Sequence, residues 1–205
     1  MTVHSSLFLR IAASAALLSG VLSCNPDSIA TPTGGPAFSR GGVPPNPGPA
    51  TYEYHAGDAF LASLNAAFSP DVAMASNGDK VELKGTGTLS VFPNAVTGGG
   101  TFTHKDAAGA VIATGTWAAT QLLEFQSYGG SPAVPPTFRA GMALMRVHLS
   151  PSAGGAGLDA TLRISCHLPQ TDVPGGFEEG IRLAVANAVN FNREVSGATV
   201  FVVVP

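Results

Sequence analysis

Arg146 and Arg163 are the side chains whose type and predicted placement suit ligand binding. Each lies in a segment of alternating polar and apolar residues, on either side of the glycine-rich stretch 152–157. Pairing the two apolar faces across this turn sets Leu149 opposite Leu158 and brings the two arginines within about 7–8 Å of each other. Two guanidinium groups on one polar face can hold a carboxylate or a phosphate if that face lines a lumen or a cleft. If the face is turned to bulk water, the pair only solubilises the sheet.

The histidines suggest a metal site, but their spacing does not support one. Apart from His4 in the predicted signal peptide, they lie at His55, His104, His148 and His167 and form no close His-x-His or His-x-x-x-His pair. The same hairpin register places His148 opposite Asp159, with His167 about 26 Å further along its own strand. That distance is too long for a shared metal ion about 2 Å from each ligand. We therefore predict no metal ligand and no cofactor.

Three further positions have both a chemical and a structural interpretation. Cys166 is a candidate nucleophile, but its apolar neighbours on the same strand face favour a buried, inert thiol. Trp117 is a candidate ligand platform, although a single tryptophan in a strand is usually part of the core. Glu178 and Glu179 follow a Pro-Gly-Gly turn and form either an acidic loop or a turn cap. Catalysis by this pair would need a positioned partner that spacing does not identify.

The sequence contains none of the common catalytic motifs. It has no Gly-x-Ser-x-Gly elbow, phosphate loop, His-Glu-x-x-His pair or acidic calcium loop. The triplet Gly98–Gly100 precedes a predicted strand, so it lacks the helix N-terminus that binds phosphate. Charged residues make up only 11% of the chain and the net charge is −3, which disfavours nucleic acid. We predict no catalytic residue and no nucleic-acid partner.

Alternation of polar and apolar residues predicts that residues 51–205 are mostly β-strands. Val81, Leu83 and Leu89 share one strand face, for example, and Asn77-Gly78 before them is a hairpin signal. The predicted strands lie near 52–56, 70–75, 80–92, 98–105, 110–119, 121–128, 140–149, 158–168, 181–192 and 198–204. Segment 58–68 is either a short helix capped by Asp58 or a further strand.

Long strands separated by polar turns indicate an all-β domain, either a closed antiparallel barrel or a two-layer β-sandwich. Glycines at 85 and 87 and at 98–100 fit strongly coiled strands, which slightly favours the barrel. The apolar run 200–204 is expected to be a central strand, because an exposed edge of this composition would aggregate.

A separate chemistry is indicated at Cys24. The uncharged, mostly apolar run Ile11–Leu22 is shorter than the about 20 residues of a membrane-spanning helix and fits a signal-peptide core. It ends in Val21-Leu22-Ser23-Cys24. This segment resembles the lipobox of bacterial lipoproteins, in which the cysteine becomes the diacylated first residue. The resemblance implies a signal peptide over 1–23 and lipidation of Cys24. Ordinary cleavage near Ser23 and a retained anchor helix are the alternatives.

Composition divides the rest of the chain into a linker and a domain. Residues 24–50 are rich in proline, glycine, serine and threonine, which predicts a disordered, semi-stiff spacer. Residues 51–205 are enough for a single β domain with its own hydrophobic core.

Together these patterns predict an exported protein of the cell envelope, attached to a membrane through lipid on Cys24. A secreted or periplasmic soluble product is the alternative. We expect the β domain to bind a small or anionic ligand, or a partner protein of the envelope, without catalysis. A barrel-scaffold enzyme acting on a small molecule and a structural envelope component are the two alternative functions.

Overall fold

The computed structural model describes residues 51–175 and 177–204. The predicted signal peptide, Cys24 and the linker up to residue 50 lie outside the described residues. Within them, the strands join into one 11-stranded sheet. Its strands are β1 (Thr51–Ala56), β2 (Asp71–Ala75), β3 (Lys80–Ser90), β4 (Ala95–Val96), β5 (Gly99–Lys105), β6 (Val111–Gly129), β7 (Phe138–Pro151), β8 (Leu158–Cys166), β9 (Gly180–Val185), β10 (Asn190–Ser196) and β11 (Thr199–Val204). The prediction of an all-β antiparallel domain is confirmed.

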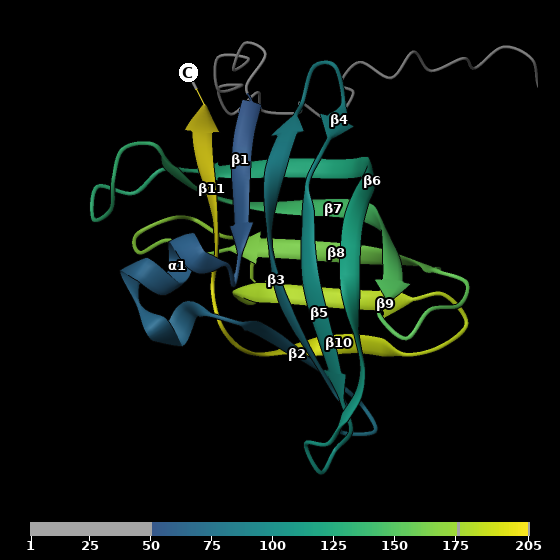
Figure 1. The fold of residues 1–205 in the computed structure, drawn as a ribbon. Coiled ribbons are helices and arrows are strands. Elements are labelled where there is room, and N and C mark those ends of the chain that lie inside the picture. The colour runs from purple at the N-terminus through teal and green to yellow at the C-terminus, as the bar shows by residue number, and fades with distance from the viewer. Residues whose placement is uncertain (1–50, 176, 205) are drawn as a thin grey trace, which may run out of the picture. The chain divides into compact units, whose positions relative to one another are not determined.

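The strand pairings close on themselves. The order is β1-β11-β7-β6-β5-β3-β2-β10-β9-β8, with β1 also pairing β3 and β7 also pairing β8. Figure 1 shows β7 to β10 running crosswise behind β1, β3 and β5. The run at 200–204 forms β11, which pairs with β1 and with β7 as expected of a central strand.

Strands β3 and β7 each change partner along one edge. In β3, Lys80–Leu83 pairs with β2, whereas the following residues from Gly85 pair with β1. In β7, residues from Gly141 onward pair with β8, whereas Phe138 and Arg139 pair with β11. Each change leaves a gap in the hydrogen-bond ladder that other groups must fill.

The segment predicted as either helix or strand is helical. It contains α1 (Ala59–Leu64) and the short 3-10 helix η1 (Ala66–Phe68). The Asp58 carboxylate accepts a hydrogen bond from the backbone N–H of Leu61 at 3.1 Å, which is a standard N-cap. Neither of these two helices is long and apolar enough to cross a membrane.

Two predicted strand boundaries are wrong. The strands expected at 110–119 and 121–128 are one strand, β6, because a bulge near Thr120 bends it without ending it. Figure 1 shows β6 turning from the front strands toward the rear ones. The strand expected at 181–192 is instead the hairpin β9–β10. Its turn contains Asn187 at φ 57°, a left-handed conformation that asparagine tolerates better than most residues.

Trp117 of β6 belongs to the main hydrophobic core and is 3% exposed, which confirms the prediction that it is a core residue. Its ring stacks on Tyr54 with 6.5 Å between centroids, and its indole N–H donates to the Lys84 carbonyl at 3.3 Å. A Cβ on Gly85 would lie 2.3 Å from the Trp117 ring. Glycine at this position therefore makes room for the largest core side chain.

We expect Gly85→Ala to destabilise the domain by about 2–3 kcal/mol, because the added methyl overpacks the core against Trp117. Urea denaturation of the full chain measures this loss. Gly175→Ala is the matched control, since no atom lies within 4 Å of a Cβ at that position. Equal stability of the two variants would contradict this account of the core.

Candidate functional site

Strands β7 and β8 pair in the predicted register. Arg146 lies opposite Thr161, His148 opposite Asp159 and Leu149 opposite Leu158. The two faces of the β7–β8 pair differ in burial, since Met145, Leu162 and Cys166 on one face are fully buried. The arginines therefore project from the opposite, outer face and not into an interior lumen.

The buried face also accounts for Cys166. The thiol is 0% exposed, and burial raises its pKa well above the ordinary value. A thiol that stays protonated in apolar surroundings is a poor nucleophile. The interpretation of Cys166 as a buried core residue is confirmed.

The outer face of β7, β8 and β9 is hollowed into a groove of about 640 Å³. Its polar lining side chains can donate or accept hydrogen bonds, and they are Thr120, Arg146, His148, Asp159, Thr161, Asn187 and Asn190. Arg146 is exposed and makes no ion pair with any described residue. Its guanidinium group is thus available to a ligand in the groove.

His148 stands beside Arg146 but has little freedom to act on a ligand. Its Nδ1 is 2.9 Å from the Asp159 carboxylate. Its Nε2 lies so close to Gly157 that a Cβ there would be 2.0 Å away. The imidazole therefore ties the two strands together and packs against the glycine of the turn.

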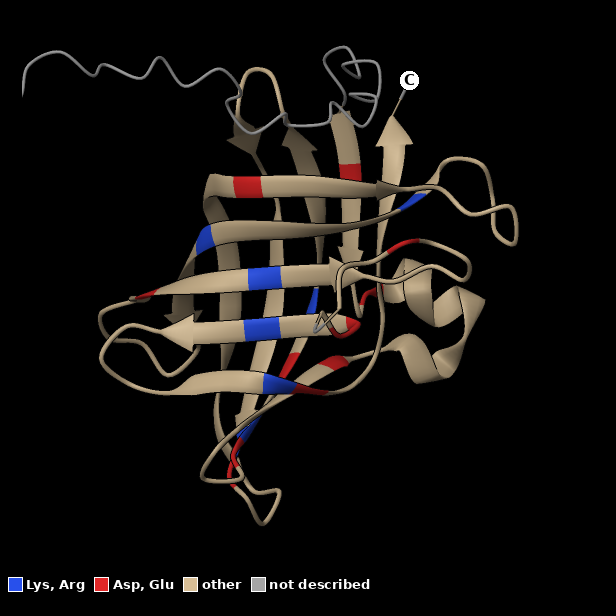
Figure 2. Ribbon diagram, turned by 180° about the vertical axis from the view of Figure 1, so that it is seen from behind, with Lys and Arg blue, Asp and Glu red and all other residues tan. Residues whose placement is uncertain are grey.

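A second hollow of about 260 Å³ adjoins this groove and shares Thr161, Ala184 and Asn190 with it. It is lined by Arg163 of β8 and Arg182 of β9, which are paired across the two strands. Figure 2 shows basic residues side by side on these neighbouring strands. The groove and the second hollow together bring three arginines to one face of the sheet.

Arg163 and Arg182 differ from Arg146 because both form ion pairs with Glu194. Arg163 Nη2 is 2.6 Å and Arg182 Nε 2.7 Å from Glu194 Oε1. Burial alone would raise the pKa of Glu194, but the hydrogen bond from Arg182 and further contacts lower it. The ring of Phe177 covers Arg163, with 5.4 Å from Cζ to the ring centroid. Of the two arginines predicted to bind a ligand, Arg163 is thus engaged by Glu194, whereas Arg146 forms no ion pair with a described residue.

Two buried carboxyl groups lie close to this cluster, and the sequence did not single out Asp71. Its side chain is fully buried, and neither oxygen has a hydrogen-bond partner among the described residues. Burial, reinforced by the charges of Glu179 and Glu194, raises the pKa of Asp71 from 3.8 to about 8. Burial likewise raises the pKa of Glu179 from 4.5 to about 7.

Glu179 bridges the gap where β7 changes partner. Its carboxylate accepts hydrogen bonds from the backbone N–H of His167, just after β8, and of Thr199, at the start of β11. The Thr199 hydroxyl also lies 3.2 Å from this carboxylate. Of the two roles considered for Glu178 and Glu179, the structure supports capping for Glu179. Glu178 is exposed and pairs with Arg182 at 3.3 Å.

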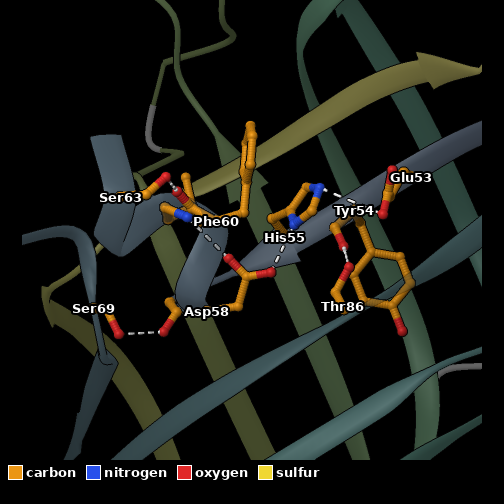
Figure 3. Close-up of polar contacts among 10 residues, drawn as sticks. Glu53, Tyr54, His55, Asp58, Phe60, Ser63, Ser69 and Thr86 are labelled. Atoms are coloured by element: carbon orange, nitrogen blue, oxygen red, sulfur yellow. Dashed lines mark hydrogen bonds and ion pairs between the residues drawn. The ribbon is translucent and has the colours of Figure 1, made fainter. Parts of the chain in front are cut away.

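Two other histidine–aspartate pairs also escaped the sequence analysis. His55 Nδ1 lies 2.6 Å from Asp58, as Figure 3 shows, and Asp58 also caps α1. Nε2 of His55 lies 3.7 Å from Glu53 and so faces a second carboxylate, not a hydroxyl nucleophile. His104 Nε2 lies 3.2 Å from Asp79. The i, i+3 spacing of His55 and Asp58 is a local signal, whereas the other pair depends on strand register.

Within the described residues, no group of three or more His, Cys, Asp or Glu side chains is arranged to hold a metal ion. Comparisons of the chain with family models, with curated proteins and with solved structures found no match. A functional assignment therefore depends on the geometry of the described residues.

We expect Asp71→Asn to flatten the pH dependence of stability. The folded protein holds protons on Asp71 and Glu179 that the unfolded chain releases near pH 4. The contribution of these two groups to stability is therefore fully present below that pH and is lost as pH rises toward 7 and 8. Between pH 5 and pH 8 the wild type should lose about 1–3 kcal/mol more than the variant.

Chemical denaturation of the full chain at a series of pH values measures this difference. Asp172→Asn is the control, because Asp172 is exposed. Identical pH profiles for the wild type and Asp71→Asn would show that Asp71 is ionised in the folded state.

Proposed function

We propose that this protein is an exported binding protein whose β domain holds a small anionic ligand in the groove on the outer face of β7–β9. The observation that carries the proposal is the exposed guanidinium of Arg146 in the wall of the 640 Å³ groove, which forms no ion pair within residues 51–175 and 177–204. A guanidinium group binds carboxylate or phosphate oxygens through two parallel hydrogen bonds. The amides and hydroxyls around it can bind the rest of the ligand.

The geometry of the groove favours binding over catalysis. General acid–base chemistry needs a titratable atom within hydrogen-bond reach of the substrate. His148 is the histidine at the groove, and its Nδ1 is held by Asp159 while its Nε2 lies against Gly157. This contact with the turn restricts the approach of a substrate to the imidazole, which supports binding over the enzyme alternative.

We also propose that the closed pairing of strands is an antiparallel barrel, with a two-layer sandwich as the alternative. The pairing of β1 with both β11 and β3 supports closure, as does the pairing of β7 with both β6 and β8. The bulge in β6 also supports it, because bulges bend strands where a sheet curls on itself.

The proposed location is the cell envelope, with the domain held to a membrane by lipid on Cys24. The proposal is supported by the apolar run 11–22 followed by Val21-Leu22-Ser23-Cys24. Acyl chains add about 0.8 kcal/mol of membrane affinity for each buried methylene. Residues 24–50 would then separate the binding domain from the membrane surface.

We expect Arg146→Ala to lower the affinity of the full chain for inorganic phosphate and for citrate by about tenfold, the equivalent of one charge-assisted hydrogen bond. Isothermal titration calorimetry measures the affinities. Lys84→Ala is the control, because it removes the same charge from an exposed position of β3 outside the groove. No binding by the wild type would favour the structural envelope component, and an equal loss in both variants would reduce the effect to net charge.

Expression of the full chain in a bacterial host should yield a membrane-associated protein that begins at Cys24 and carries acyl chains. Intact-mass spectrometry after detergent extraction measures the modification. Cys24→Ser should abolish it and release the protein from the membrane fraction. An unmodified, soluble wild-type product would refute lipidation and favour ordinary cleavage near Ser23.

A further inference from the structure

A third hollow, distinct from the two on the arginine face, lies between the strands of the sheet. It is lined by residues next to the turns of the β5–β6, β7–β8 and β9–β10 hairpins. Its volume is about 180 Å³, and we call it the end crevice. Its lining residues come from strands on both sides of the core and include Val81, His104, Ala113, Leu158, Leu183 and Phe191. Every one of these side chains except that of His104 is apolar.

The single polar side chain of the end crevice is already occupied on one nitrogen. His104 Nε2 lies 3.2 Å from Asp79, and the imidazole ring meets Phe191 edge to face with 5.2 Å between centroids. A water molecule in a cavity needs two to four polar partners, which this lining does not offer. A charged ligand would lose its hydration without gaining an ion pair.

The back wall of the end crevice is fixed by the core. Val81, Leu183 and Phe191 are 1–2% exposed and belong to the main hydrophobic cluster. The crevice remains open because small side chains, Ala113 and Ala188, stand where larger ones would fill it. The hollow is thus preformed, and a ligand would not have to displace packed side chains.

The entrance is apolar as well. Leu158, at the start of β8, lines the crevice and is 44% exposed. An exposed apolar group at a hollow loses contact with water when a ligand covers it, and this favours binding.

We propose that the end crevice binds a small uncharged molecule the size of one aromatic or alicyclic ring. Its volume is close to that of an apolar cavity of about 150 Å³ that stays dry and takes up benzene. Its lining carries no Lys, Arg, Asp or Glu side chain, in contrast to the outer groove, which is lined by Arg146 and Asp159. The two sites therefore select different ligand classes, and this proposal does not depend on the anion site.

Toluene is the probe, added to the full chain with methyl groups labelled for NMR. Saturable shifts are expected in the methyl signals of Val81, Leu149, Leu183 and Val185, together with a higher melting temperature. Inorganic phosphate should leave these signals unchanged. No saturable binding of toluene, or shifts confined to other methyl groups, would overturn the proposal.

Two variants and a matched control locate the binding. Ala113→Leu fills the end crevice from within, and Ala188→Phe covers it from the turn between β9 and β10. Because Ala188 is exposed, its variant should fold even if Ala113→Leu does not. Both should weaken toluene binding at least tenfold. Ala118→Leu on the same strand as Ala113 is exposed and lies outside the crevice, so it should bind as the wild type does. Unchanged binding in Ala188→Phe and in a folded Ala113→Leu would exclude the crevice.

Discussion

The change of partner along one edge of β3 and of β7 is the constraint on which the rest of this structure depends. Wherever a strand changes partner, backbone donors at the gap lose their ladder bonds and must be satisfied by other groups. At β7 the Glu179 carboxylate accepts bonds from His167 and Thr199. At β3 the gap lies beside Asp71, whose backbone is in close contact with Gly57 and Gly197. Closure of the sheet at β7 thus uses the Glu179 carboxyl group in a place where charge is unfavourable.

Burial tends to raise the pKa of Asp71, Glu179 and Glu194 alike, and their different ion-pair partners explain why their pKa values diverge. Glu194 receives two guanidinium groups, and the hydrogen bond from Arg182 with further contacts lowers its pKa despite its desolvation. Asp71 receives no guanidinium group from the described residues, so its neutral form is favoured up to about pH 8. The same cluster uses the cationic capacity of Arg163 and Arg182 internally, which leaves Arg146 as the arginine of this face that can bind a ligand.

The sequence predicted well what depends on alternation. The polar and apolar faces of β7 and β8, their register and the burial of Cys166 all follow from matching two apolar faces across a turn. It predicted poorly where a strand bends or breaks. The pattern divided β6 into two strands at the bulge near Thr120, although the strand continues through it. The pattern also gave one strand over 181–192, where the turn at Asn187 separates β9 from β10. Predicting the pairs His104–Asp79 and His148–Asp159 requires knowing the strand register. The sequence predicted that register only for the hairpin that contains His148 and Asp159.

The sequence by itself determined which residues share a strand face, because side chains along a strand alternate with a period of two. It also contains the segment ending at Cys24 that resembles a lipobox, since such a signal is read from the linear chain. Tertiary structure alone decided that the arginine face is the outer one and that Glu194 occupies two of its three arginines. It alone brought Asp71, Glu179 and Glu194 together, and left an apolar crevice between strands. These features join residues far apart in the chain, and their energies come from burial and charge pairing that no local pattern encodes.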